Sequence, residues 1–187
     1  MRITLLCAAL ALSFCSFASA GPTEQLASIL REASASSNPS VSFLEGIGKL
    51  GDADLNAAQV AAAVEAGAVS PALRPILDRV QRIRLSGDTV RFDFSSAFAL
   101  NLGGRGYAHF DRQVSFQIDG RTLKRFRGFK LSQTAKGMKL APRSIRFGSE
   151  GGVPIATVNM GIAGTHKISL APQHAEAQGL TSRLRFG

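Results

Sequence analysis

The most chemically suggestive stretch of this sequence is residues 121–130, where cations and aromatic rings alternate closely. Five cations and two phenylalanines stand there: Arg121, Lys124, Arg125, Phe126, Arg127, Phe129 and Lys130. Guanidinium groups bind phosphate or sulfate oxygens in pairs, and phenylalanine rings offer a flat apolar surface beside them. Four more cations follow closely and would extend the patch: Lys136, Lys139, Arg143 and Arg146. We therefore expect this region to bind an anionic ligand.

The spacing of these cations constrains the strand that carries them. Arg121, Arg125 and Arg127 share one parity of the sequence, whereas Lys124 and Lys130 share the other parity with Phe126. Successive side chains of a regular strand point to opposite faces, so these cations cannot all point outward from a regular half-buried strand. A bulge, an edge strand or an exposed hairpin arm would resolve the conflict. The alternative interpretation is that the cations protect an edge strand against aggregation.

Residues able to support catalysis or to bind a metal are sparse. The three histidines, His109, His166 and His174, form no HExxH motif, and the sequence contains no GxSxG motif. An acid–base pair of His109 and His166 would be needed for a ribonuclease-like reaction, and nothing in their spacing favours one. The glycine-rich residues 103–106 lack the features of a phosphate-binding loop and predict a hairpin turn. We expect no enzymatic activity, no cofactor and no metal.

The elements that must position the basic segment are strands. From about Gln81 onward, apolar residues recur at every second position, which is the period of half-buried antiparallel strands. The pattern occurs at 83–85, 90–94, 114–118, 138–140, 145–147, 155–160, 167–170 and 183–186, with glycine-rich turns between many of these segments. We expect about eight strands in an antiparallel sheet that curls into a half-barrel or a barrel.

Residues 21–80 predict short helices instead. Leu26, Ile29, Leu30 and Ala33 follow the i, i+3, i+4, i+7 spacing of an amphipathic helix. A run of helices followed by a run of strands is typical of the α+β class. The sequence therefore predicts one α+β domain over residues 21–187, with its helices (21–80) packed on a curved antiparallel sheet (81–187).

The aromatic residues suggest a different ligand. An apolar inner face of the curled sheet would carry six phenylalanines: Phe92, Phe94, Phe98, Phe110, Phe116 and Phe129. These side chains would either form an ordinary packed core or line a cavity for a lipid or similar apolar ligand. A combined interpretation places an apolar tail in the cavity and an anionic headgroup against the arginines.

Residues 1–20 have the features of a cleavable secretory signal. Arg2 precedes an apolar run, and Ala18-Ser19-Ala20 has the small-x-small pattern that signal peptidase accepts. We expect a mature chain that starts at Gly21 and is secreted or periplasmic. Both cysteines, Cys7 and Cys15, would be removed with the signal, so we expect no disulfide.

Charge is distributed unevenly along the chain, whose formal net charge is +9. Residues 21–73 contain two cations and six anions, which gives −4, and residues 74–187 contain nineteen cations and seven anions, which gives +12. Such asymmetry favours an anionic partner for the second part, or contact between the two parts of the chain. We therefore predict an exported binding protein for a lipid headgroup, lipopolysaccharide or another polyanion, with nucleic acid not excluded. A carrier of an apolar ligand and a structural or interaction protein of the envelope are the alternatives.

Overall fold

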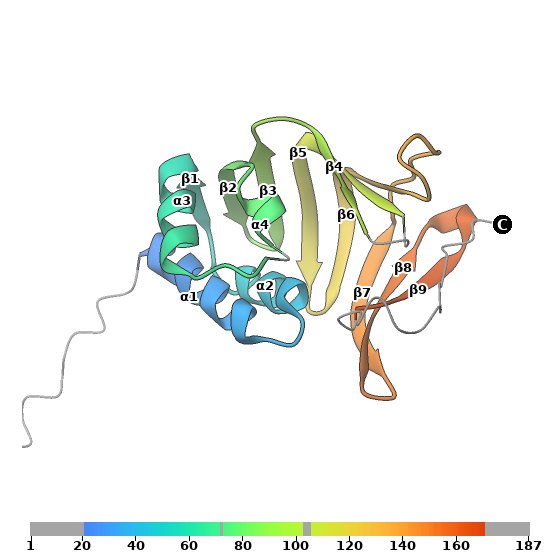
Figure 1. Ribbon diagram of the computed structural model, residues 1–187, viewed down its shortest axis with the longest axis horizontal. Coiled ribbons are helices and arrows are strands. Elements are labelled where there is room, and N and C mark those ends of the chain that lie inside the picture. Colours follow the sequence, from blue (N-terminus) through green and yellow to red (C-terminus); the bar gives the residue numbers. More distant parts are fainter. Residues whose placement is uncertain (1–20, 72, 103–105, 171–187) are drawn as a thin grey trace, which may run out of the picture.

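The computed structural model describes residues 21–71, 73–102 and 106–170 (Figure 1). The protein is an α+β protein with a curved antiparallel sheet that does not close into a barrel, which confirms the predicted fold class. The described part of the sheet has the strand order β1-β2-β3-β5-β6-β7-β8-β9, and β4 pairs with β5 outside this path. Neighbouring strands are therefore mostly neighbours in sequence.

The described helices lie in the first part of the chain and cover one end of the sheet (Figure 1). They are α1 (Pro22–Ala35), α2 (Pro39–Ile47), α3 (Ala57–Ala66) and α4 (Arg74–Leu77). Side chains cap two of them. The Asn38 side chain accepts a hydrogen bond from the Val41 N–H, and Asn56 and Gln59 form a reciprocal capping box at the start of α3.

The strands begin earlier in the chain than the sequence predicts. They are β1 (Ala53–Asn56), β2 (Val80–Ser86), β3 (Thr89–Phe94), β4 (Phe98–Asn101), β5 (Tyr107–Asp119), β6 (Thr122–Ser132), β7 (Ser144–Glu150), β8 (Val153–Asn159) and β9 (Thr165–Ser169). A 3-10 turn, η1 (Gly161–Ala163), joins β8 to β9.

Two expectations about individual strands need correction. Residues 21–80 are not purely helical, because β1 pairs with β2 and buries Leu55 completely. Four residues are too few to show a period of two, so the sequence pattern missed this strand. Residues 138–140 form a single bridge, Leu131 to Leu140, instead of a strand. The strand expected at 183–186 and the signal at 1–20 lie outside the described residues.

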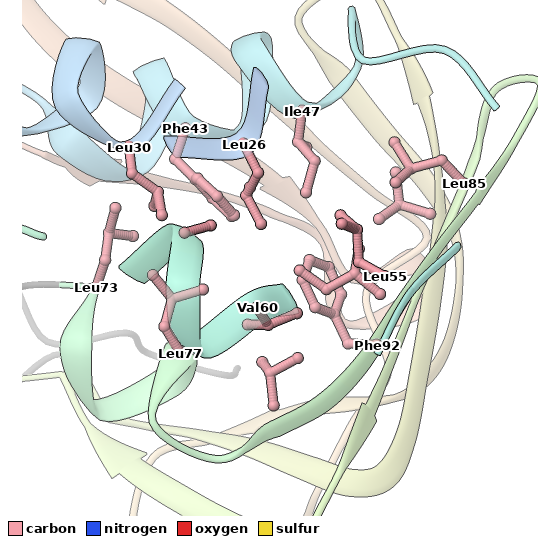
Figure 2. Close-up of a cluster of buried hydrophobic side chains, with 14 of the residues drawn as sticks. Leu26, Leu30, Phe43, Ile47, Leu55, Val60, Leu73, Leu77, Leu85 and Phe92 are labelled. Atoms are coloured by element: carbon pink, nitrogen blue, oxygen red, sulfur yellow. The ribbon is translucent and has the colours of Figure 1, made fainter. Parts of the chain in front are cut away.

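The main hydrophobic core lies between the helices and the concave face of the sheet (Figure 2). Leu26 and Leu30 from α1 and Ile47 from α2 are fully buried and meet Leu55 of β1. Core positions on β2 and β3 alternate with polar ones, which explains the half-buried pattern in the sequence. This arrangement leaves the convex face of β1–β3 without a helix.

A smaller second cluster connects the far end of the sheet to its centre. Ala108 of β5 and Leu131 of β6 pack there with Val158 and Met160. We refer to the segment from β7 to β9, residues 144–169, as the β7–β9 arm. Its ladder pairing with β6 is confined to residues 122–124, and the arm splays away from the rest of the sheet beyond them (Figure 1).

Candidate functional site

An apolar cavity of about 200 Å³ lies between the helices and the concave face of the sheet. Helices α2 and α4 form one side, and strands β3, β5, β6 and β7 form the other. Ser40 is the single polar residue among the sixteen that line it; the others are Phe43, Leu44, Leu73, Ile76, Leu77, Phe92, Phe94, Phe110, Val114, Phe116, Leu123, Phe126, Phe129, Ile145 and Phe147. The walls therefore offer hydrocarbon and aromatic surface with almost no hydrogen-bonding capacity.

Six of the eight phenylalanines that line this cavity belong to a continuous network of ring contacts: Phe92, Phe94, Phe110, Phe116, Phe126 and Phe129. Phe110 and Phe129 meet edge to face with centroids 5.2 Å apart, and Phe126 lies 5.4 Å from Phe129. Five of the six phenylalanines predicted for the inner face line the cavity. The sixth, Phe98, stacks on Phe110 with ring centroids 4.7 Å apart. The guanidinium carbon of Arg79 lies over the Phe98 ring, 5.0 Å from its centroid. The rings hold one another in place, because each contact restricts the rotation of both partners.

Strand β6 reaches the cavity through an unusual spacing. Its residues Leu123, Phe126 and Phe129 all line the cavity although they stand three positions apart. A left-handed residue lies within each interval, namely Arg125 with φ 57° and Gly128 with φ 69°. Each one interrupts the regular alternation of the strand, so the next aromatic side chain returns to the concave face. The β5–β6 pairing accordingly shifts register near these positions.

The same irregularity leaves Arg127 on the convex face. Arg127 pairs with Ser115, which stands between the cavity-lining residues Val114 and Phe116. Because alternate residues point to opposite faces, Ser115 and its partner Arg127 point away from the cavity. Of the three arrangements that the sequence allowed, a bulge, an edge strand or an exposed hairpin arm, the register shifts of the β5–β6 pairing correspond to the bulge. In the strand order β6 lies between β5 and β7, but it pairs with β7 only at residues 122–124. Residues 125–130 therefore pair with β5 alone in the described part of the chain and form a local edge of the sheet.

The ten residues predicted to form one binding patch fall on both sides of the sheet. Phe126 and Phe129 line the apolar cavity. Three cations have carboxylate partners: Arg121 lies 3.0 Å from Glu45 of α2, Lys124 lies 2.7 Å from Asp119, and Lys130 lies 3.9 Å from Asp111. The remaining cations are exposed and have no carboxylate at salt-bridge distance within the described part of the chain: Arg125, Arg127, Lys139, Arg143 and Arg146.

The convex face also holds arginines that the sequence analysis did not select. Arg84 of β2 pairs directly with Arg91 of β3, and Arg91 pairs with Ser115, so a row of aligned positions leads to Arg127. Asp93 accepts from Arg84 at 2.6 Å and from Arg91 at 3.0 Å. Burial opposes ionisation of Asp93, but these two hydrogen bonds hold its pKa below the usual value. The alternation of Arg82 and Arg84 with apolar residues was the sequence signal for this outward row.

A buried pair of His109 and Ser132 is the arrangement that most resembles catalytic machinery. Their side chains are 2.7 Å apart, and the Ser132 hydroxyl also lies 2.7 Å from the Thr134 carbonyl oxygen. The hydroxyl must donate to that carbonyl, so it accepts from the His109 Nε2–H and cannot be deprotonated by this histidine. Ser132 is fully buried, which denies it contact with a substrate. Burial and the nearby Lys139 lower the pKa of His109.

Among the described residues, His166 adds no second catalytic group to this pair. His166 Nε2 lies 3.0 Å from the Ala163 carbonyl oxygen, and His174 lies outside the described residues. Among residues 21–71, 73–102 and 106–170, no three histidine, cysteine or carboxylate side chains gather into a possible metal site. None of the helices described here is long and apolar enough to cross a membrane.

Comparisons with known proteins add no functional information, since no family model, no curated protein and no solved structure matches the chain. The apolar cavity and the cations of the convex face are therefore the two features from which a function can be argued.

Proposed function

We propose that this chain is a non-enzymatic binding protein that holds an apolar ligand, or the apolar part of a larger ligand, between its helices and its curved sheet. The observation that carries the proposal is the cavity of about 200 Å³ with one polar residue in its lining. A cavity of roughly 150 Å³ lined by leucine, isoleucine and phenylalanine stays dry and binds benzene. The space here suits an aromatic ring or a short stretch of acyl chain.

The position of the cavity supports binding over simple core packing. Proteins pack their interiors densely, and voids larger than a water molecule are few. This cavity borders helix α2 and the short helix α4, whose residues Ser40 and Ile76 are incompletely buried. Short helices that leave side chains partly exposed can move apart at a lower cost than sheet strands, so they provide a route for the ligand.

The test uses protein purified from cells that express the full chain. Mass spectrometry of the denatured protein should detect a co-purifying lipid or other apolar molecule, and titration with the dye N-phenylnaphthylamine should give saturable fluorescence. We expect Ile76→Trp to fill part of the cavity and to weaken dye binding at least about tenfold. Ile162→Trp is the matched control, because Ile162 is fully exposed and does not line the cavity. Equal dye affinity for the parent and for Ile76→Trp would refute the cavity as the binding site.

A second candidate function is binding of an anionic ligand by the basic face of the sheet. The observation that favours it is the set of exposed cations without a carboxylate partner in the described structure, among them Arg125, Arg127 and Arg146. An anion would give these guanidinium groups the charge partner that the protein does not supply. Lipopolysaccharide, another polyanion or nucleic acid would meet this requirement, and each interaction should weaken with salt.

Chromatography separates this second candidate from the first. The parent should be retained on heparin or immobilised lipopolysaccharide and should elute as salt rises, whereas the triple variant Lys124→Ala, Arg125→Ala, Arg127→Ala should elute much earlier. The charge-matched control replaces Arg31, Lys49 and Arg74, three exposed cations of the helical part, by alanine. If both triple variants elute together, overall charge explains retention and the β6 site assignment is wrong.

Export is part of the proposal. Its support is the signal-like pattern of residues 1–20, and the expected location is the periplasm or the extracellular space. N-terminal sequencing of the purified protein should begin at Gly21. A structural or interaction protein of the envelope would bind neither the dye nor the columns in these experiments.

A further inference from the structure

Three large apolar side chains are strongly exposed in the described structure, and two of them lie at the same end of the sheet. Met138 is 77% exposed and Ile162 is fully exposed, while Val153, at 42%, stands in the β7–β8 hairpin at the opposite end. Single exposed apolar residues are common on proteins. Met138 and Ile162 call for an explanation because the segments that carry them lie at one end of the arm and both segments have cations nearby.

The topology brings the segments that carry these two residues to the same end of the arm. Residues 133–143 connect the end of β6 to the start of β7, and residues 160–164 connect β8 to β9. Ser144 pairs with Asn159, and Asn159 pairs with Thr165, so both connections lie at the same end of the antiparallel arm (Figure 1). The Arg143 N–H donates to the Asn159 carbonyl oxygen at 2.7 Å, which joins the two connections directly. We call these two connections the loop tip.

The loop tip is held firmly from below. Leu140 bridges to Leu131 and packs on the second hydrophobic cluster, and Ala163 packs on the same cluster. Met160 is buried, and its N–H donates to the Gly164 carbonyl oxygen across the turn. Met138 and Ile162 are therefore carried outward by segments that have their own buried anchors. Poor packing of the loops is therefore not the cause of their exposure.

Cations lie near both apolar residues of the loop tip, in sequence for Met138 and in space for the turn that carries Ile162. Lys136 and Lys139 flank Met138 in sequence, and the Arg143 side chain lies so close to Gly161 that a Cβ atom there would be 2.8 Å from its Nε. All three cations are exposed, and none has a carboxylate at salt-bridge distance in the described part of the chain. The surface thus combines two protruding apolar side chains with three uncompensated positive charges.

We infer that the loop tip docks on an anionic lipid bilayer, with Met138 and Ile162 inserted at the headgroup boundary and Lys136, Lys139 and Arg143 against lipid phosphates. Apolar insertion and attraction to anionic lipids are the two contributions that hold proteins at a membrane interface. A hydrated sulfated or phosphorylated polymer would satisfy the cations but would leave both apolar side chains in water. The inference deepens the anionic-ligand proposal by naming a bilayer as the partner, and it does not depend on the cavity or on the β6 cations.

Sedimentation with lipid vesicles tests the contribution of the apolar side chains. We expect the protein purified from cells expressing the full chain to bind vesicles with about 30% phosphatidylglycerol, and to bind pure phosphatidylcholine at least about tenfold more weakly. The double variant Met138→Ser, Ile162→Ser should lose at least about tenfold in binding, because both insertions are removed. Val153→Ser is the matched control and should bind like the parent. Failure of the parent to bind, or equal binding of the double variant, would overturn the inference.

Fluorescence locates the contact independently. The chain contains no tryptophan, so Met138→Trp introduces a single reporter. Its emission should shift to shorter wavelength on phosphatidylglycerol vesicles and stay unchanged on heparin, whereas Val153→Trp should not respond to either. Shifts of equal size for the two reporters would overturn the proposed orientation. Heparin retention that survives in Met138→Ser, Ile162→Ser while vesicle binding is lost would separate this inference from the β6 anion site.

Discussion

The helix-covered end of the sheet and the β7–β9 arm are built from similar strands but are stabilised differently. Strands β1–β3 bury their concave face under the helices, and Leu26, Leu30 and Ile47 are fully enclosed. In the described structure the arm joins β6 through three ladder pairs and a small cluster, and it reaches the main core through Ile145 and Phe147 at the start of β7. We therefore expect the first region to supply most of the folding free energy. The second can therefore expose apolar and charged side chains to a partner.

Matched isoleucine substitutions provide the strongest test of this comparison. Ile47→Ala removes a fully buried side chain under the helices, and we expect it to lower the free energy of unfolding by about 3 kcal/mol. Ile168→Ala, on the arm, removes a side chain that is only partly buried and should cost about 1 kcal/mol. Urea denaturation measures both losses. Equal losses would show that the arm contributes as much to stability as the helix-covered end.

Matched glycine substitutions compare β6, which joins the two regions, with the arm itself. Gly128 has φ 69°, and an added Cβ would overlap the Gln113 carbonyl oxygen of β5. Gly151 has φ 58° in the β7–β8 hairpin with nothing within 4 Å of an added Cβ. Gly151→Ala should cost about 1 kcal/mol for the left-handed backbone alone, and Gly128→Ala about 2 kcal/mol or more. If the two variants unfold at the same urea concentration, the close β5–β6 approach contributes nothing.

Acidification should weaken the boundary between the two regions, where His109 packs. Burial and Lys139 hold the pKa of His109 below its ordinary value of 6.5, so the unfolded chain binds the proton first as pH falls. The stability that neutral His109 contributes is complete at pH values above its ordinary pKa and is lost progressively as pH falls below it. The urea midpoint should therefore drop between about pH 7.5 and about pH 5.5, above the range in which carboxylates titrate.

His109→Gln is the control for this pH dependence, since glutamine offers Ser132 a polar partner and does not titrate. The variant should show a flatter profile over the same range. If parent and variant decline in parallel, another group is responsible for the pH dependence.

The smallest effect is expected for an exposed ion pair within the arm. Lys167 Nζ lies 2.9 Å from Glu150, and both side chains are 61% exposed. Exposed pairs of this kind contribute little because water and salt screen them. Lys167→Ala should lower the free energy of unfolding by at most about 0.5 kcal/mol, and added salt should abolish the difference. A loss as large as that of Ile168→Ala would mean that the arm depends on charge more than on packing.

Residue patterns predicted the α+β class because both periods are visible in the sequence. The alternation around Ile83, Phe92 and Phe116 marks strands with one buried face, and five of the predicted phenylalanines do line the concave side. A departure from a regular half-buried strand in β6 was also predictable, since cations and rings of both parities occupy one short segment, but the sequence did not choose between a bulge, an edge strand and an exposed hairpin arm. Strand β1 was not predictable from the sequence, because its four residues depend on pairing with β2 for their conformation.

The odd or even position of a residue in β6 was not enough to predict which face of the sheet its side chain would occupy. Arg125 adopts a left-handed conformation that favours glycine, and this places Phe126 in the cavity while Arg127 points outward. The carboxylate partners of the cations could not be predicted either. Arg121, for example, forms an ion pair with Glu45, which stands 76 positions earlier in a helix. The loop tip went unnoticed because Met138 and Ile162 occupy segments whose exposure only the fold determines.

The strand order has a kinetic consequence. Most strands pair with a neighbour in sequence, and β7 and β8 are joined by a two-residue turn at Gly151 and Gly152. Short connections close at a small cost in chain entropy, so such a sheet can grow hairpin by hairpin without a search for distant partners. Two pairings are exceptions: α3 and α4 separate β1 from β2, and β4 lies in the chain between the paired strands β3 and β5. Refolding should therefore begin among the sequential hairpins and finish when β1 and the helices cover the concave face.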